Sequence, residues 1–318
     1  MLLNLVEYHW AEHIDDALLL LGRLDIKTVA LAGGTYLLGQ QDDSIQAVVD
    51  LRDLGLAYVT EDTRSLHIGA MTTLQSIADE PLLQEFAGGV LAQTALASSS
   101  SRLIRNCATI GGTLGTGTAS QADLLTALVA LEAEVVVRSG SKTQVNLSGG
   151  TLEYPGLALS GVIYKGKHER RISCATFNLE RRPNELIVEI IIPYNKANNG
   201  ASFARVGRTS TDAALLNAVA QVETQEGVYK HVCLAFGGVN MEPRRLATLE
   251  RYLEGQPADN QHLLAALQAS IAEFHPPTDF RVSGSYRRVS GINLAYHVLE
   301  EATNLAQRRG MVPSGKGV

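Results

Sequence analysis

The spacing of apolar and polar positions divides the first half of the chain into short strands and helices. Short continuous or alternating apolar runs indicate strands, and apolar residues that recur every three to four positions indicate helices. The strands expected on this ground are residues 3–8, 27–31, 47–50, 58–59, 66–68 and 134–138, and the expected helices are residues 14–24, 73–78, 81–90, 91–98 and 123–131. This alternation predicts an α+β or α/β domain.

The second half begins with a stretch of different character. Gly and Ser interrupt short β-like runs in residues 139–171, whose charged end suits an exposed hairpin or connector. The strands expected after it are residues 185–192, 203–206, 218–222 and 228–236, and the helices are residues 246–253, 262–273 and about 287–307. A second sheet followed by helices is therefore expected, which makes two domains for a chain of 318 residues.

The chain has two glycine-rich segments, and the second precedes the apolar helical pattern at residues 123–131. Ala32, Gly33, Gly34 and Thr35 follow directly on the strand at residues 27–31, and residues 105–117 carry four glycines between Gly111 and Gly117. Glycine has no Cβ, so we expect these segments to be loops whose backbone amides approach a bound anion. A helix N-terminus beyond the second loop would add free N–H groups and a positive partial charge. Together the two segments predict one phosphate-binding site that is formed by two separate loops. Their residues do not identify the ligand that carries the phosphate.

Composition narrows the class of protein. The chain is 45% hydrophobic and 19% charged, its net charge is -6 and its pI is about 5.8, as in a globular protein with a real core. The sequence has no basic patch beyond short arginine pairs such as Arg170 with Arg171, which argues against a nucleic-acid partner. The N-terminus lacks a signal-peptide pattern and no run reaches the length of a membrane span, so a cytoplasmic protein is expected. Cys107, Cys174 and Cys233 have no metal-ligand spacing, and their odd number argues against a disulfide framework.

Several short motifs have simpler explanations than catalysis. Residues 9–13 match the H-x-x-E-H zinc pattern, but His9 ends a strand pattern and His13 begins a helix. Residues 161–167 match the start of a P-loop, but His168 stands where Ser or Thr should hold magnesium. Asp123 fits the N-cap of its helix, which spacing favours over a ligand contact. No His and Asp arrangement makes a nucleophile of Ser98, and the other serines of residues 98–101 also lack one.

A series of motifs in fixed order resembles a known family. Residues 32–38 are similar to its A-G-G-T-D-L-L signature, with Tyr36 in place of Asp, and residues 68–73 are similar to its I-G-A-M-T-T. Residues 105–114 resemble R-N-x-A-T-I-G-G-N-L, with Thr113 for Asn. Further matches at residues 123–135, 184–194, 236–239 and 285–288 extend the resemblance over nearly the whole chain. The family is the FAD-binding medium subunit of the molybdenum hydroxylases, of the xanthine dehydrogenase and carbon monoxide dehydrogenase type.

The resemblance implies a fold and its domains. The fold is α+β, with a two-subdomain FAD-binding domain of the vanillyl-alcohol-oxidase (PCMH-like) type and a smaller α+β domain behind it. On this sequence the FAD-binding domain would span residues 1–175, divided at about residue 57 into 1–57 and 58–175. The C-terminal domain of the flavoprotein subunit would follow at residues 176–290, and a helix and tail at residues 291–318.

The resemblance also implies a site and a function. FAD would lie between the domains with its pyrophosphate on both glycine segments, Thr109 would donate a hydrogen bond, and Asp123 would contact the flavin nucleotide. Arg205 stands where many members have a Lys near the flavin, so it keeps the positive charge with a different reach. The FAD-binding residues expected are Leu31, Ala32, Gly33, Gly34, Thr35, Tyr36, Leu37, Thr109, Ile110, Gly111, Gly112, Asp123 and Arg205. The chain would carry no substrate-oxidising or metal site of its own.

The implied role is electron transfer within a heteromeric oxidoreductase complex. A large subunit with the molybdenum cofactor and a small iron–sulfur subunit would be the partners, and NAD, quinone or oxygen would accept the electrons. Two alternatives stay open from the sequence. The chain could be a flavin-free scaffold of the same kind of complex, or a stand-alone FAD oxidoreductase. The substrate of the complex, the acceptor and the oligomeric state cannot be read from the residues.

Overall fold

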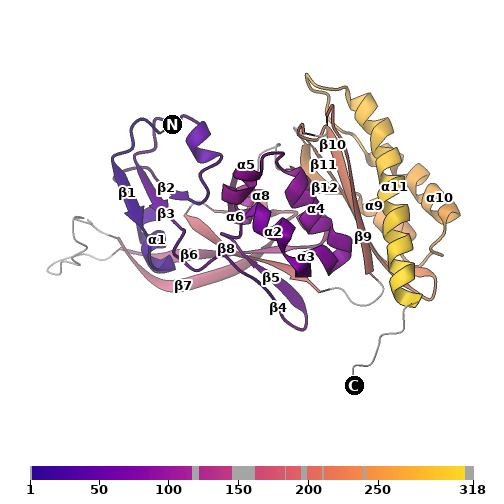
Figure 1. The fold of residues 1–318 in the computed structure, drawn as a ribbon, viewed down its shortest axis with the longest axis horizontal. Helices are drawn as coiled ribbons and strands as arrows, with labels where there is room; N and C mark the ends of the chain where they lie inside the picture. Colours follow the sequence, from indigo (N-terminus) through magenta and orange to yellow (C-terminus); the bar gives the residue numbers. More distant parts are fainter. Residues whose placement is uncertain are drawn as a thin grey trace.

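Three β-sheets follow one another along the long axis of the molecule in the computed structural model (Figure 1). The structure describes residues 2–116, 122–144, 162–182, 184–194, 199–209, 211–238 and 241–311. The N-terminal sheet lies at one end, a longer sheet with most of the short helices occupies the middle, and the last sheet with the C-terminal helices forms the other end. Among the described residues, no helix is long and apolar enough to span a bilayer.

The N-terminal sheet is small and parallel. Its strands are β1 (Glu7–Trp10), β2 (Thr28–Leu31) and β3 (Ala47–Asp50), in the order β1-β3-β2, with α1 (Ile14–Leu21) as a crossover and η1 (Leu37–Gly39) after β2. All four residues of β3 are buried, as expected for a central parallel strand covered on both faces. The glycine segment at residues 32–36 therefore leaves the end of a strand at the edge of this sheet.

The middle sheet is antiparallel and has the order β4-β5-β8-β6-β7. Its strands are β4 (Val59–Glu61), β5 (Ser65–Gly69), β6 (Glu134–Gln144), β7 (Val162–Ser173) and β8 (Glu185–Pro193). Buried and half-buried positions alternate along most of β8, so one face of that strand points into the core. The expected hairpin in residues 139–171 corresponds to the pairing of β6 with β7, although residues 145–161 lie outside the described part.

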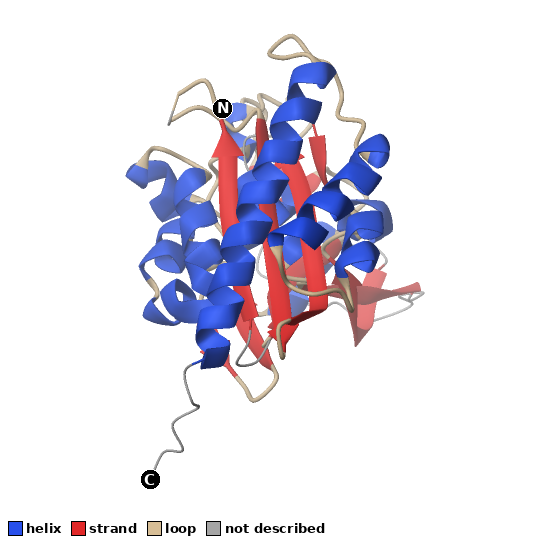
Figure 2. Ribbon diagram, turned by 90° about the vertical axis from the view of Figure 1, so that its right-hand side faces the viewer, coloured by secondary structure: helices blue, strands red, loops and turns tan. Residues whose placement is uncertain are grey.

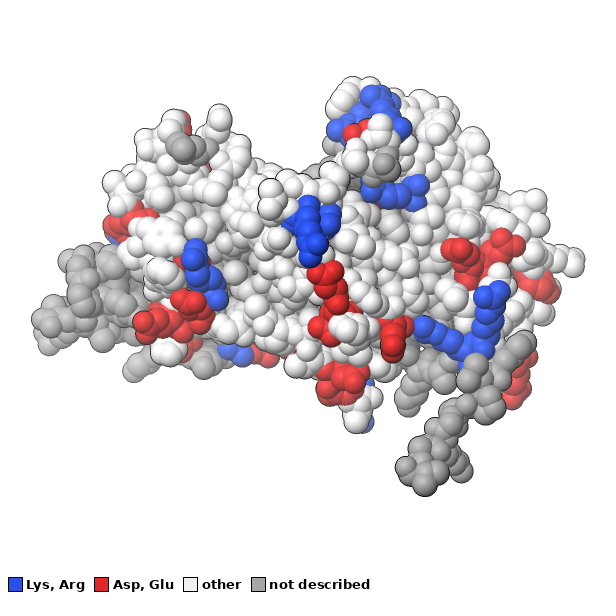
Figure 3. All heavy atoms as spheres, viewed as in Figure 1, with Lys and Arg blue, Asp and Glu red and all other residues white. Residues whose placement is uncertain are grey.

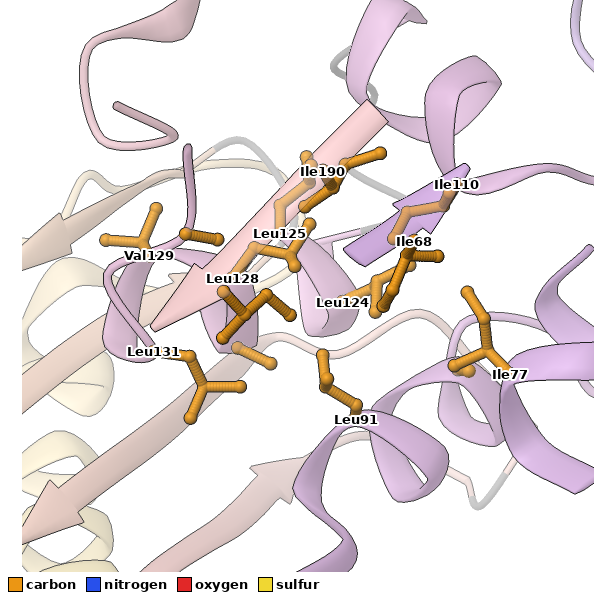
Figure 4. Packing of buried hydrophobic residues seen from close by; sticks show 14 of the residues in the cluster. Ile68, Ile77, Leu91, Ile110, Leu124, Leu125, Leu128, Val129, Leu131 and Ile190 are labelled. Atoms are coloured by element: carbon orange, nitrogen blue, oxygen red, sulfur yellow. The ribbon is translucent and has the colours of Figure 1, made fainter. Parts of the chain in front are cut away.

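Short helices cover the middle sheet and enclose the main core. They are α2 (Leu74–Asp79), α3 (Pro81–Glu85), η2 (Phe86–Gly89), α4 (Val90–Ala97), α5 (Arg102–Cys107), α6 (Ile110–Thr116), α7 (Ala122–Ala130) and α8 (Phe177–Glu180). Aliphatic side chains from these helices and from the sheet, including Ile68, Leu91, Ile110, Leu124 and Ile190, pack together in Figure 4. The main core thus joins α6, which carries the second glycine segment, to the sheet.

The helix expected at residues 81–90 is shorter in the structure, since α3 ends at Glu85 and the irregular turn η2 (Phe86–Gly89) follows. Ala87, Gly88 and Gly89 have φ values of 48°, 72° and 75°, which end α3 and redirect the chain into α4. Glycine takes this left-handed conformation without a steric penalty, and Gly88 also packs against the carbonyl of Ala201, which a Cβ would approach to 2.9 Å. The last part of the expected helix is therefore a turn, which contacts β9 of the C-terminal sheet.

The C-terminal sheet lies between two layers of helices. Its strands β9 (Asn199–Val206), β10 (Leu216–Gln225), β11 (Val228–Gly238) and β12 (Met241–Arg245) have the order β12-β11-β10-β9 and are antiparallel. The helices α9 (Ala247–Leu253), α10 (Asn260–Ser270), η4 (Ile271–Glu273) and α11 (Gly284–Met311) follow, and Figure 2 shows α11 crossing over the strands. Residues of α4 and α7 pack on the other face, so the first seven residues of β10 are all buried.

The pairing of β8 and the packing of α11 indicate where the chain divides into domains. β8 lies between β5 and β6, so the middle sheet continues to Pro193, beyond the domain boundary at residue 175 that the resemblance implied. The helix expected as a separate C-terminal unit begins at Gly284 and packs along β9 and β10. We therefore propose a first domain that ends after β8 and a second domain that begins at β9 and includes α11.

Arg287 of α11 provides a test of how the C-terminal domain is held together. Its side chain is fully buried and donates to the carbonyls of Leu215 and Pro277, at 3.0 and 2.6 Å, and to Asp279 at 2.7 Å. The Arg287 hydrogen bond lowers the pKa of Asp279 to about 2. A carboxyl with a depressed pKa stabilises the fold at pH values above its unfolded pKa, and that contribution disappears as the pH falls through the folded pKa.

Asp279→Asn is therefore expected to lower the thermal unfolding midpoint at pH 7 and to lose this effect in acid. The wild-type and variant midpoints should converge between about pH 4 and pH 2, because the unfolded carboxyl titrates near ~3.9. Calorimetry over this range measures the difference directly. A gap that stays constant from pH 7 to pH 2 would show that the charge of Asp279 does not contribute.

Candidate functional site

The first glycine segment is a tight turn after β2. Gly34 has a φ of +69°, which favours glycine. Gly33 lies against the backbone of the second segment, since a Cβ on it would be 1.6 Å from the carbonyl oxygen of Cys107. A side chain at residue 33 would force the two segments apart. The sequence suggested that the two segments act together, and in the structure their backbones are in contact.

The described part of the second glycine segment, residues 105–116, is mostly helical, whereas a loop was expected from its glycines. α5 ends at Cys107 and α6 begins at Ile110, with Thr109 before it. The hydroxyl of Thr109 accepts from the amide of Gly112 at 3.1 Å, and its carbonyl accepts from the amide of Thr113 at 2.9 Å. A threonine cap and the buried side chain of Ile110 stabilise this short helix despite its glycines.

The amides of the two segments differ in what they can bind. At the start of α6, the amides of Ile110 and Gly111 donate to the carbonyls of Thr72 and Ala70, and that of Gly112 donates to Thr109. In the first segment, the amides of Gly33, Gly34, Thr35 and Tyr36 have no acceptor among the described residues. The backbone amides of the first segment are therefore available to bind an anion. The amides at the start of α6 are already used, and its glycines let the ligand approach the helix backbone closely.

Two adjoining hollows lie between the segments. The smaller, of about 80 Å³, is enclosed by both glycine segments, and the larger, of about 730 Å³, extends from them along the middle sheet to α8. The larger volume is within the usual range for a small-molecule site. Both are lined by Ala30, Ala32, Tyr36, Leu37, Gly112 and Thr116, so they form one cleft.

The cleft gathers most of the residues expected from the sequence. Those that line it are Ala32, Gly33, Gly34, Thr35, Tyr36, Leu37, Thr109, Gly111 and Gly112. Leu31, Ile110, Asp123 and Arg205 are not among the lining residues. Leu31 is half-buried at the end of β2 and packs on the small N-terminal core, and the side chain of Ile110 belongs to the main core, so both hold the glycine segments in place.

The far end of the cleft carries two arginines that the sequence showed only as a short basic pair. Arg181 and Arg182 follow α8, and Arg181 donates to the carbonyl of Gly115 in α6 at 2.5 Å. Glu185, also in the lining, accepts from the side chain of Arg170 and from the amide of Arg182. Although burial acts to raise it, these hydrogen bonds hold the pKa of Glu185 below its usual value. Their place beside the cleft depends on β8, whose pairing could not be read from local sequence.

Asp123 and Arg205 meet at the contact between the two domains. The carboxylate of Asp123 is 2% exposed, accepts from the amide nitrogen of Asn217 and lies 3.4 Å from the Arg205 guanidinium. Asn217 in turn accepts from Thr126 at 2.8 Å, and Arg205 donates to the carbonyl of Ala97 at 3.1 Å. Burial raises the pKa of Asp123, against the opposite effects of Arg205 and Asn217. These polar contacts thus connect α7 and α4 of the first domain to β9 and β10 of the second.

The cap expected for Asp123 is wrong in its position. α7 begins at Ala122, so Asp123 lies in the first turn of the helix and not before it. Its negative charge still lies near the positive end of the helix dipole. The side chain turns to the neighbouring sheet instead, because Asn217 and Arg205 supply its partners there.

The other motifs do not assemble sites. His9 lies in β1, where it pairs with Glu7 at 2.7 Å, and His13 precedes α1, so the two histidines do not share a helix face. Lys167 is in strand β7, while Gly161 lies outside the described residues.

On the face drawn in Figure 3, basic and acidic side chains of the described residues form small mixed groups.

The fold is α+β, with a second domain packed beside a cleft. At one end of the cleft lie backbone amides that have no acceptor among the described residues, an arrangement that suits a protein that binds a nucleotide phosphate. Residues 4–195, more than half of the chain, match the family model described as the FAD binding domain in molybdopterin dehydrogenase. Residues 201–302 match the CO dehydrogenase flavoprotein C-terminal domain. The chain belongs to this family of FAD-binding medium subunits, and its cofactor is FAD. The family resemblance and the α+β fold expected from the sequence are confirmed.

The chain is similar to relatives along its whole length. It is 25% identical to the xanthine dehydrogenase FAD-binding subunit of Escherichia coli O157:H7, over 95% of this chain and 98% of that protein. It is 24% identical to the carbon monoxide dehydrogenase medium chain of Hydrogenophaga pseudoflava, over 95% and 97%. These relatives are subunits of oxidoreductases.

Solved structures share the fold. Carbon monoxide dehydrogenase from Hydrogenophaga pseudoflava superposes with a TM-score of 0.78 at 24% identity, over 95% of this chain and 98% of that one. Quinoline 2-oxidoreductase from Pseudomonas putida 86 gives a TM-score of 0.76 at 21% identity, over 94% and 97%. At such identities the superpositions establish the architecture.

The residues of the cleft fit FAD. Its pyrophosphate needs several hydrogen-bond donors without a side chain in the way, and the free amides of residues 33–36 opposite Gly112 supply this arrangement. The remaining length of the cofactor needs an elongated hollow, which the 730 Å³ part of the cleft provides. A Cβ on Gly112 would come within 3.0 Å of the Thr109 hydroxyl and face Ala32 at 3.9 Å, inside the space between the segments.

Proposed function

We propose that this chain is the FAD-binding electron-transfer subunit of a heteromeric molybdenum hydroxylase. It takes electrons from iron–sulfur clusters of a partner subunit and passes them to an external acceptor such as NAD, quinone or oxygen. The single observation that carries the proposal is the convergence of both glycine segments on one cleft, with free amides on one side and Gly112 on the other. When bound, FAD supplies the redox chemistry, and the protein supplies binding, orientation and the electrostatic environment.

The cleft residues divide this work among them. The amides of residues 33–36 donate to the pyrophosphate, and Thr109 fixes α6 so that Gly112 stays close to Ala32. Apolar side chains of the larger hollow, such as Met71 and Ile187, exclude water from the cofactor. Arg182 adds a positive charge at the far end, which favours an anionic cofactor over a neutral one.

In this proposal, Asp123 and Arg205 do not contact the cofactor and instead hold the two domains in place. Their buried contact, with Asn217 between the domains, holds the C-terminal sheet against α7 and α4. The domain that follows the cleft is thereby fixed relative to the cofactor. We propose a positioning role for the pair in place of the direct contacts that the resemblance implied.

Partner subunits are part of the proposal because this chain lacks the other redox centres' ligands. A cluster held by four thiolates needs four cysteines, and the sequence has three, far apart along the chain. The relatives are named as an FAD-binding subunit and a medium chain, which supports membership of a larger complex. The xanthine and carbon monoxide in these names are named for the relatives.

Copurification and anaerobic reduction test the proposed function. A tagged chain expressed in its own host should copurify with iron and molybdenum and with about one FAD per chain. The flavin absorbance should bleach when the substrate-reduced partner is present, and should stay unchanged when the isolated FAD-loaded chain receives the same substrate. A complex without flavin would indicate a scaffold, and turnover by the isolated chain would indicate a stand-alone oxidoreductase; either result overturns the proposal.

A further inference from the structure

A cluster of Glu, His and Cys side chains lies on the side of the C-terminal sheet that faces the first domain. His231 and Cys233 are two positions apart on β11, so their side chains point to the same face of the strand. Glu132 comes from the turn between α7 and β6, in the first domain. Spacing along the sequence gave no sign of this cluster, because about a hundred residues separate Glu132 from the other two.

The three ligand atoms are close enough to share one ion. His231 Nε2 lies 3.0 Å from Glu132 Oε2 and 3.3 Å from Cys233 Sγ, and all three atoms are within 4.8 Å of one another. Zinc bonds of ~2.0–2.3 Å in a tetrahedron place neighbouring ligand atoms about 3–4 Å apart. We propose that Glu132, His231 and Cys233 bind one divalent zinc-like cation, with water as the fourth ligand.

The surroundings of the cluster support a cation at this position. Arg245 donates at 2.6 Å to Oε1 of Glu132, which leaves Oε2 directed to the histidine. Nδ1 of His231 lies 3.2 Å from Glu254, and a carboxylate on the other ring nitrogen is the usual way to orient a metal-binding imidazole. Arg245 is also paired with Glu250. With Cys233 as thiolate, the negative charges of Glu132, Glu250, Glu254 and Cys233 exceed the positive charge of Arg245 by three, and one divalent ion offsets two of them.

Ligand type and access select the kind of ion. Thiolate and imidazole favour zinc and related transition metals, while magnesium and calcium prefer sites made of oxygen ligands alone. Cys233 is fully buried, whereas Glu132 and His231 are about one third exposed, so the ion enters from their side and keeps a water there. Because Glu132 belongs to the first domain and the other ligands to the second, the ion fastens the two domains together.

Cobalt and zinc binding to the untagged full-length chain test the site. Co²⁺ should give one thiolate charge-transfer band, which saturates at one ion per chain and disappears when Zn²⁺ is added. Cys233→Ser should abolish the band. The double variant Cys107→Ser with Cys174→Ser should keep it, since these two cysteines lie outside the cluster. Zn²⁺ should also raise the unfolding midpoint of the wild type.

Two conservative variants cover the case in which Cys233→Ser fails to fold. Glu132→Gln and His231→Gln change half-buried positions, and each should weaken Co²⁺ binding by more than about tenfold, since loss of an outer-shell partner alone weakens metal binding ~10–100-fold. Absence of a cobalt band in the wild type would overturn the proposal. A band that survives Cys233→Ser, or unchanged affinity in both conservative variants, would do the same.

Discussion

Gly112→Leu is expected to weaken FAD binding by at least about 100-fold, equivalent to ~3 kcal/mol. The new side chain would start 3.0 Å from the Thr109 hydroxyl, on the side of Ala32, in the space between the glycine segments where we propose that the pyrophosphate binds. The amide of Gly112 already donates to Thr109, so the substitution acts by filling the cleft and not by removing a free donor. Fluorescence titration of the apoprotein with FAD measures the affinity.

Gly39→Leu is the matched control for this loss. Gly39 ends η1 close to the first glycine segment, it is exposed, and a Cβ on it meets nothing within 4 Å. Gly39→Leu therefore adds the same side chain outside the cleft, and its FAD affinity should stay within about twofold of the wild-type value. Equal affinity in Gly112→Leu and the wild type would show that the cofactor does not lie between the two segments.

Asp123→Ala is expected to lower the free energy of unfolding of the apoprotein by about 3 kcal/mol, because it leaves Asn217 and the Arg205 guanidinium without their carboxylate partner at a buried contact. Asp123→Asn keeps a hydrogen-bonding side chain of the same shape, and about half of the loss is expected for it. Chemical denaturation of the apoprotein gives both values. FAD affinity should fall much less than in Gly112→Leu, since Asp123 does not line the cleft.

Asp212→Ala separates this local effect from a general effect of charge. Asp212 is exposed, and its backbone carbonyl accepts from Arg205, so the variant removes a nearby negative charge without opening the buried contact. Its unfolding free energy should stay within about 0.5 kcal/mol of the wild type. If Asp123→Ala leaves apoprotein stability unchanged and weakens FAD instead, the direct flavin contact implied by the sequence resemblance is correct and the positioning role is wrong.

The sequence predicted that the two glycine segments act together, and they line one cleft, but it did not predict their conformation. Glycine content at residues 111–117 suggested a loop, whereas the described part of this segment is helical because Thr109 caps it and Ile110 anchors it in the core. Gly111 meets a packing need, since a Cβ on it would be 2.8 Å from Ala70. A glycine that permits close packing and one that frees an amide look the same in a sequence.

Residues that meet through sheet topology could not be found from local patterns. Arg181 and Arg182 reach the cleft because β8 inserts between β5 and β6, an order that no local pattern reveals. Glu132 meets His231 for a similar reason, since the turn after α7 is brought to β11 by the packing of the two domains. Strand and helix patterns, by contrast, depend on neighbouring residues, and the strands of the C-terminal sheet at β9, β10 and β11 were predicted to within a few positions.

The FAD content of the purified wild-type chain is the first test of FAD binding between the two glycine segments. The protein is unfolded to release its cofactor, and FAD is quantified against protein before and after incubation with excess FAD and removal of the unbound fraction. About one FAD per chain, retained in Gly39→Leu and lost in Gly112→Leu, is the predicted result. A folded wild-type chain that retains no FAD after this incubation would contradict the account.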